Sequence, residues 1–336
     1  MVTPMAIFDV DEFSSWLKDF YEGLLAGSRP YGSFLWGRQP VPNLLYINDV
    51  VWMRWLRDDL ALSDVQRAGL IESINDCQYP EGGFYHNPVF ENHTWQHATW
   101  RAMVSLNMLG GKTRYPLAFL EALKDVKTCE AWLGSHDAAR NEIAHHRYAL
   151  GAFVMGSGVG APWREAFFSG VDALQRERSG FWAKAPTGER REESLSPTFL
   201  FSVLHLAFGR EIPRGERVLD TVLSYQRENG NFSSGDGPAF CDMDALFLLQ
   251  SISGTLGTRR DEVLAAMRKS ARALRGYWDG ARDRVFLANP HNTLAICGML
   301  SVLKDAIPDE VRGNRPFRFP YAAGEFLRPP ESGAGR

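Results

Sequence analysis

Residues 225–254, YQRENGNFSSGDGPAFCDMDALFLLQSISG, contain the pattern that decides the fold. A glutamine, Gln226, precedes a glycine-rich loop around Phe232, and a segment with little charge begins near Phe240. Glycine and asparagine favour a tight turn before the aromatic residue. A helical segment that is apolar on every side must be buried. The stretch therefore predicts a loop that leads into an inner helix.

This arrangement recurs along the whole chain. Aromatic residues beside glycines follow one another at intervals of 46 to 51 residues, at Trp36, Phe84, Trp132, Phe181, Phe232 and Trp278. A repeat of this length is typical of folds in which each unit is one supersecondary element that buries its apolar face against its neighbours. Six such units cover most of the sequence.

Each repeat contains two candidate helices. The first precedes the aromatic residue and has apolar residues three or four positions apart, which predicts an outer helix with one exposed face. These outer segments are residues 11–25, 62–76, 115–126, 162–177, 214–228 and 259–275. The second follows about twelve residues after the aromatic residue and carries little charge. These inner segments are residues 48–56, 93–109, 145–156, 196–208, 241–252 and 291–303.

The alternation predicts an all-α protein, an α/α toroid of six helical hairpins around a central cavity. We expect one domain over residues 1–306, and a proline-rich wrapping segment and tail over residues 307–336.

The composition excludes several classes of protein. The 336 residues are 45% hydrophobic and 23% charged with a formal charge of −3, which indicates a folded chain without an electrostatic footprint for nucleic acid. No stretch approaches the ~18 apolar residues of a membrane span, and no signal-peptide pattern opens the chain, so we expect a cytoplasmic protein. The four cysteines form no CxxC pair, which predicts free thiols. A small-molecule or oligosaccharide substrate fits best.

Polar residues near the starts of the inner segments should meet at one rim of the toroid. They are Asn48, Asp49, His93, His97, His145, His146, Ser196, Thr198, Asp242, Asp244, His291 and Asn292. An alternative interpretation is that some of these residues only cap helices or are hydrogen-bonded core residues. Carboxylates and imidazoles that share a dry cavity can carry out general acid–base catalysis.

Asp242 and Asp244 are the leading catalytic candidates. Two carboxylates in one desolvated site do not both ionise readily, so one pKa rises and that group can deliver a proton. We expect Asp244 to be the proton donor, with Asp242 and His291 supporting it. The same three residues are candidates for a divalent ion, zinc or magnesium.

Further residues complete the predicted site. His97, His146, Asp49 and Tyr148 are candidates for a base or for orienting groups. The candidates for substrate binding, by cation–π attraction or stacking in most cases, are Trp52, His93, Trp95, Trp100, Thr198, Phe199, Phe247 and Trp278.

Residues 225–254 and residues 77–111, CQYPEGGFYHNPVFENHTWQHATWRAMVSLNMLGG, resemble the repeat of the terpenoid cyclases and protein prenyltransferases. Four of the six units carry this resemblance, which implies the toroid. The DxDD motif of class II terpene cyclases matches at Asp242 and Asp244 but meets Ala245 at its third aspartate. The zinc ligands of the prenyltransferase β subunit match at Asp242 and His291, with Asp244 in place of the cysteine.

These observations predict an enzyme of the isomerase or lyase class that cyclises, isomerises or hydrates an isoprenoid-like substrate. Two alternatives stay open. Residues 90–100, FENHTWQHATW, are loosely similar to the Asn-His-x-Tyr/Trp motif of α-barrel alginate lyases, which implies a lyase or hydrolase acting on acidic oligosaccharides with His97 or Tyr148 as base. The other alternative is a toroid that binds a ligand without changing it.

Overall fold

The computed structural model describes residues 7–26, 43–80, 82–84, 95–118, 120, 123–134, 159–182, 194–235, 237–281, 290–315 and 317. Of this described part, 68% is helical, in eleven helices, and the only strands are two of two residues each. The prediction of an all-α protein is confirmed. Among the described helices, none combines the length and the apolar character that crossing a bilayer requires.

The chain divides into two compact units. Unit 1 comprises Met1–Phe20, Leu56–Asp58 and Gln175–Pro320, and unit 2 comprises Tyr21–Trp55, Asp59–Leu174 and Tyr321–Arg336. Helix α1 (Val10–Ala26) begins in unit 1 and ends in unit 2.

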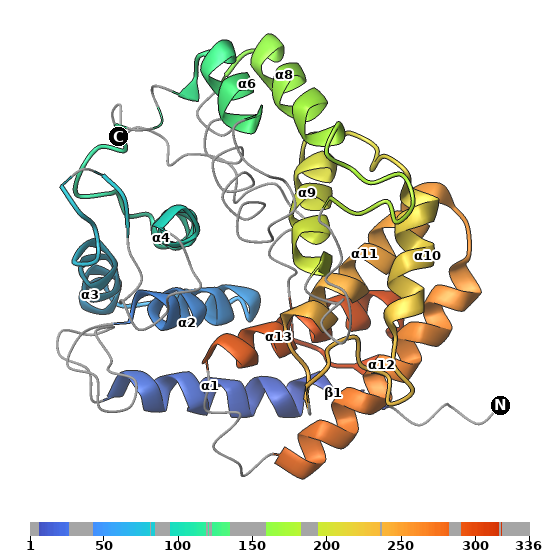
Figure 1. The fold of residues 1–336 in the computed structure, drawn as a ribbon. Coiled ribbons are helices and arrows are strands. Elements are labelled where there is room, and N and C mark those ends of the chain that lie inside the picture. Colours follow the sequence, from blue (N-terminus) through green and yellow to red (C-terminus); the bar gives the residue numbers. More distant parts are fainter. Residues whose placement is uncertain are drawn as a thin grey trace. The chain divides into compact units, whose positions relative to one another are not determined.

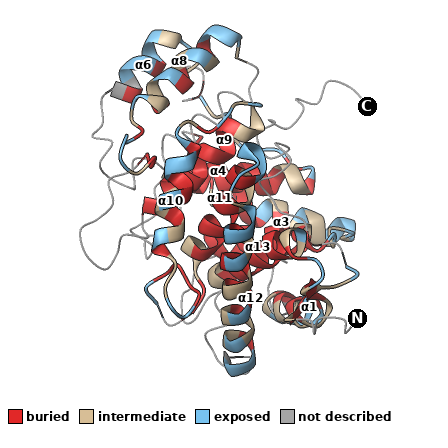
Figure 2. Cartoon of the chain, turned by 90° about the vertical axis from the view of Figure 1, so that its right-hand side faces the viewer, coloured by how far each residue is buried: buried red, intermediate tan, exposed pale blue. Residues whose placement is uncertain are grey.

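Unit 1 contains the helices of the later repeats (Figure 1). They are α9 (Leu195–Ala207), α10 (Gly215–Tyr225), α11 (Phe240–Leu256), α12 (Arg260–Ala281) and α13 (Pro290–Ala306), with strands β1 (Phe8–Asp9) and β2 (Val311–Arg312). Figure 2 shows α9, α11 and α13 buried along most of their length, whereas α10 and α12 each expose one face. The alternation of outer and inner helices therefore holds in this unit.

Unit 2 contains the earlier helices. They are α2 (Leu44–Leu56), α3 (Asp64–Asn75), α4 (Trp95–Leu109), α6 (Val126–Gly134) and α8 (Ala161–Asp172). Helices α2 and α4 are largely buried, as expected of inner helices, and α3 and α8 each keep an exposed face. The expected inner segment at residues 145–156 lies outside the described residues.

Two helix boundaries differ from the prediction. Helix α6 begins at Val126, where the expected outer segment 115–126 ends, because Asp125 caps it by accepting the backbone N–H of Thr128 at 2.9 Å. Helix α12 continues to Ala281 and includes Trp278, whose ring packs 5.1 Å from that of Phe13 in the core. Trp132 and Trp278 therefore lie within helices and not in loops.

The glutamines of the repeat join consecutive hairpins. At Gln78, Gln175 and Gln226, the side-chain Nε2 donates to a glycine carbonyl of the following loop at 2.7–3.1 Å, and to a second carbonyl 37 to 40 residues further along at 2.5–2.8 Å. The loop glycine is required, since Gly230 has a φ of +95° and a Cβ there would lie 2.6 Å from the carbonyl oxygen of Lys269.

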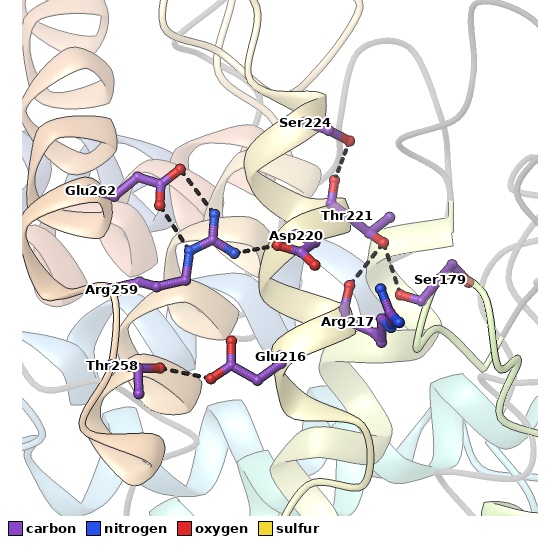
Figure 3. A network of polar contacts seen from close by, with 9 residues as sticks. All are labelled: Ser179, Glu216, Arg217, Asp220, Thr221, Ser224, Thr258, Arg259 and Glu262. Atoms are coloured by element: carbon purple, nitrogen blue, oxygen red, sulfur yellow. Dashed lines mark hydrogen bonds and ion pairs between the residues drawn. The ribbon is translucent and has the colours of Figure 1, made fainter.

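A polar network joins α10 to the start of α12 within unit 1 (Figure 3). Arg259 forms ion pairs with Asp220 on α10 and, at 2.8 Å, with Glu262 on α12. The hydroxyl of Thr258 donates to Glu216 at 2.9 Å. Arg259 has a φ of +58°, a backbone conformation that is strained for residues other than glycine. These contacts hold it in place at the helix start.

The segment after α13 pairs with the start of the chain. Strands β1 and β2 are parallel, with Phe8 opposite Val311. Asp11 accepts the backbone N–H groups of Asn314 and Arg315 at 2.9 and 3.0 Å, and these bonds lower the pKa of Asp11. The first residues of the expected wrapping segment thus lie against the N-terminus of α1. The sequence did not predict the pairing of β1 with β2.

Candidate functional site

Asp242 holds the glycine-rich loop on α11. Its Oδ1 accepts the backbone N–H groups of Phe232 at 2.6 Å and Ser233 at 3.3 Å, and its Oδ2 accepts that of Ala239 at 2.8 Å. The side chain is buried, which raises the pKa of Asp242, while its hydrogen bonds with Phe232, Ala239 and Ser233 act in the opposite direction. Both carboxylate oxygens are therefore engaged by backbone donors, as expected of a structural acid at the third position of a helix.

Another repeat fills the same role with a neutral side chain. The backbone N–H of Phe84 donates to the hydroxyl of Thr99 on α4 at 2.9 Å, as that of Phe232 donates to Asp242. Thr99 and Asp242 are therefore equivalent positions of the repeat. Two residues further along each helix, Arg101 is equivalent to Asp244.

Asp244 has a different environment from Asp242. Asp244 lies on α11 and is 1% exposed. Its carboxyl group forms a hydrogen bond with the hydroxyl of Ser196 on α9. Its Oδ2 is buried and has no hydrogen-bond partner in the described part of the chain. Desolvation raises the pKa of Asp244 well above its usual value, the bond from Ser196 opposes this rise, and the charge of Asp242 adds to it. The arrangement favours the protonated acid.

Aromatic contacts link the three inner helices of unit 1 near Ser196 and Asp242. The rings of Phe199 on α9 and Phe247 on α11 meet edge to face at 5.1 Å, and His291 at the start of α13 lies against Phe240 with ring centroids 4.3 Å apart. Residues near the starts of α9, α11 and α13 thus come together in this unit, as expected.

Other predicted residues of unit 1 have structural contacts. The buried hydroxyl of Thr198 donates to the carbonyl of Ser194 at 3.0 Å within α9, so it serves its own helix. Trp278 is 1% exposed and packs against Phe8, Phe13 and Trp16, which makes it a core residue.

The predicted metal ligands do not assemble. Among the described residues, no group of three or more His, Cys, Asp or Glu side chains could hold a metal ion. Asp242 gives both oxygens to backbone N–H groups, and His291 packs on an aromatic ring. The structure therefore does not support Asp242, Asp244 and His291 as a zinc or magnesium site.

Unit 2 contains a second buried polar cluster. Arg101 on α4 forms an ion pair with Asp49 on α2, and both residues are buried. The guanidinium carbon of Arg101 lies 4.8 Å from the ring centroid of Trp52, whose Nε1 donates to Ser105 at 3.1 Å. The ring of Trp100 meets that of Trp52 edge to face at 5.6 Å.

Sequence reasoning identified Asp49, Trp52, Trp100 and His97 here but missed Arg101. The signal was a single arginine in an inner segment with no other Lys, Arg, Asp or Glu. His97 is buried, with its ring 5.9 Å from that of Trp100, and Trp95 is half-buried at the start of α4.

The remaining predicted residues, His93, His146 and Tyr148, lie outside the described residues. Comparisons with protein-family models, with curated proteins and with solved structures find no match to this chain.

Proposed function

We propose that the protein is an enzyme in which Asp244 acts as a general acid on an isoprenoid-like substrate. The observation that carries this proposal is the Asp244 carboxyl group, buried on an apolar helix, with an Oδ2 that no described residue hydrogen-bonds. Desolvation raises the pKa of Asp244 well above its usual value, which favours the protonated form, and a protonated carboxyl group can transfer its proton. We further propose that the repeats close into the α/α toroid expected from their alternation.

The first chemical step follows from these residues. The π electrons of a substrate double bond form a new C–H bond with the proton of Asp244, which leaves a carboxylate and a carbocation. The Ser196 hydroxyl stabilises that carboxylate by its hydrogen bond. The faces of Phe199 and Phe247 are suited to stabilise the cation. Ring closure, loss of a proton or addition of water then gives a cyclised, isomerised or hydrated product.

Asp242 is assigned a supporting role in this scheme. Its three backbone hydrogen bonds hold the loop that leads into α11, so it positions the helix that carries the acid. Its negative charge also contributes to the raised pKa of Asp244.

The experiment is product analysis in D2O with isoprenyl diphosphates and neutral terpenoids. An acid that exchanges its proton with solvent places one deuterium from solvent in the product. We expect Asp244→Asn to abolish turnover and Asp242→Asn to retain part of it. Full turnover by Asp244→Asn, or no conversion of any isoprenoid by the wild-type protein, would contradict the proposal.

The alternatives have less support. Arg101, a buried cation on α4, is already paired with Asp49. Asn92, His93 and Tyr148, on which the acidic-oligosaccharide hypothesis depends, lie outside the described residues. Recovery of an isoprenoid that binds but is unchanged after long incubation would favour a toroid that only binds its ligand.

A further inference from the structure

The buried polar cluster of unit 2 has hydrogen-bonding atoms that the protein does not satisfy. We call Asn48, Asp49 and Arg101 the Asn48–Arg101 cluster. Asn48 is fully buried, and neither its Oδ1 nor its Nδ2 has a hydrogen-bond partner among the described residues. The Nε of Arg101 is likewise buried without a partner there. Buried polar groups are nearly always hydrogen-bonded in native proteins. Asn48 is the sequence neighbour of Asp49, which pairs with Arg101, so we assign these three atoms to one site for a bound molecule.

Trp52 connects the two residues, Asn48 and Arg101. Asn48 is one helical turn before Trp52 on α2, so the two side chains share a face of that helix. Arg101 lies over the same ring, 4.8 Å from its centroid. The indole of Trp100 packs edge to face against Trp52 and adds an apolar wall.

The internal repeat supports a functional position here. Arg101 occupies the place on α4 that Asp244 occupies on α11, two residues after the side chain that holds the aromatic loop residue. Each of the two reaches the preceding inner helix of its own unit, Arg101 at Asp49 on α2 and Asp244 at Ser196 on α9. The same position therefore carries a cation in one unit and an acid in the other.

The chemistry of the cluster restricts its ligand. Asp49 and Arg101 neutralise each other, so an added anion would be a buried net charge, which is strongly unfavourable. A carboxylate or a carbonyl group can only accept hydrogen bonds, which would leave the Oδ1 of Asn48 unsatisfied. A hydroxyl group both donates and accepts.

We propose that the Asn48–Arg101 cluster binds a neutral hydroxyl-bearing ligand, a sugar or polyol. One ligand oxygen accepts from the Arg101 Nε and the Asn48 Nδ2, and a neighbouring hydroxyl donates to the Asn48 Oδ1. The indole of Trp52 lies beside the carbon skeleton. This site is separate in its residues and its chemistry from the acid proposed at Asp244.

The test is saturation-transfer-difference NMR on the full chain with glycerol, inositol, glucose and maltose, and with glucuronate as the charged comparison. We expect a saturable signal from at least one neutral probe and none from glucuronate. Asn48→Leu, which is nearly isosteric, should weaken that binding about tenfold or more. It should also melt at a higher temperature than the wild type without ligand, because it removes an unsatisfied buried amide.

Ser202→Ala is the matched control, since Ser202 in unit 1 is also fully buried with an Oγ that lacks a partner among the described residues. It should melt higher as well but leave binding unchanged. Asn48→Ala repeats the test if the leucine variant does not fold. Three outcomes would overturn the proposal: no neutral probe binds saturably, glucuronate binds as well as glucose, or both Asn48 variants bind as the wild type does. The first would mean that ordered water alone fills the cluster.

Discussion

Asp242 and Asp244 are two residues apart on one helix, yet their environments differ. We therefore expect substitution by asparagine to raise the stability of the protein at Asp244 and to lower it at Asp242. Because the pKa of Asp244 is raised in the folded state, the folded protein binds more protons than the unfolded chain from about pH 4 up to that raised pKa. Its contribution to stability is therefore complete below about pH 4 and is lost as the pH rises.

We predict that Asp244→Asn removes this loss. The melting temperature of the variant minus that of the wild type should be near zero at about pH 4 and should become increasingly positive toward neutral pH, while turnover disappears. Thermal unfolding of both proteins across this range measures the difference. A melting-temperature difference that falls toward neutral pH would show that folding does not raise the pKa of Asp244.

Asp242→Asn should lower stability at every pH in the same range. The amide nitrogen of asparagine would face a backbone N–H that the carboxylate now accepts, at Phe232 or at Ala239. Leaving a buried donor unsatisfied costs about 1–3 kcal/mol in the free energy of unfolding. Urea denaturation measures this cost, and a stabilised Asp242→Asn would contradict the structural role that we assign to this side chain.

The sequence assigned the proton-donor role to Asp244 and a supporting role to Asp242, but it did not predict how Asp242 is bonded. Asp244 sits inside an apolar segment, and that local pattern alone indicates desolvation. The role of Asp242 depends on backbone N–H groups of Phe232 and Ser233, ten and nine residues earlier, which only the folded loop presents. Arg101 was missed because its partner, Asp49, is 52 residues away in the sequence.

Among the elements, the glutamines that join consecutive hairpins provide the clearest test. The Nε2 of Gln226 donates to the carbonyls of Gly230 and Ala266 and to the hydroxyl of Ser270 at 2.8–3.1 Å. In Gln226→Glu a carboxylate oxygen would face both carbonyls. We predict that the free energy of unfolding, measured by urea denaturation, falls by about 1–3 kcal/mol. The fall should be smaller at acidic pH, where the new carboxyl group is protonated.

Gln66→Glu is the matched control for this substitution. Gln66 completes a capping box with Ser63, whose backbone N–H donates to its Oε1 at 3.1 Å. Glutamate can accept the same bond, and its charge is favourable at a helix N-terminus. Its stability should match or slightly exceed that of the wild type. Equal losses in both variants would show that the Gln226 amide has no special role.

The elements were predictable where the pattern of burial is local. Outer helices α3, α8 and α10 lie where the apolar periodicity predicted them, and inner helices α2, α4, α9, α11 and α13 lie where the segments with little charge predicted them. The prediction was wrong at α6 and α12. Periodicity does not register the cap that Asp125 provides, nor the tertiary packing that keeps Trp278 helical beside Phe13.

For the whole molecule, the four cysteines report on the integrity of both units. None of the four forms a disulfide, and the cores bury Cys129 in unit 2 and Cys297 in unit 1. Burial raises the pKa of Cys129 to about 11 and that of the half-buried Cys77 to about 12. Only the thiolate is nucleophilic, so at about pH 8 roughly one Cys77 thiol in ten thousand is reactive at a given moment.

We therefore predict that the native protein has one rapidly reacting thiol, the half-buried Cys241, and that the protein in urea has four. Titration with an aromatic disulfide reagent at about pH 8 counts them, and Cys241→Ser should remove the rapid reaction without changing the slow one. Two or more rapid thiols in the native wild type would mean that at least one unit opens on the timescale of the reaction, because the other three are protected by burial or by a raised pKa. A count below four in urea would show that an intermolecular or intramolecular disulfide forms outside the native fold.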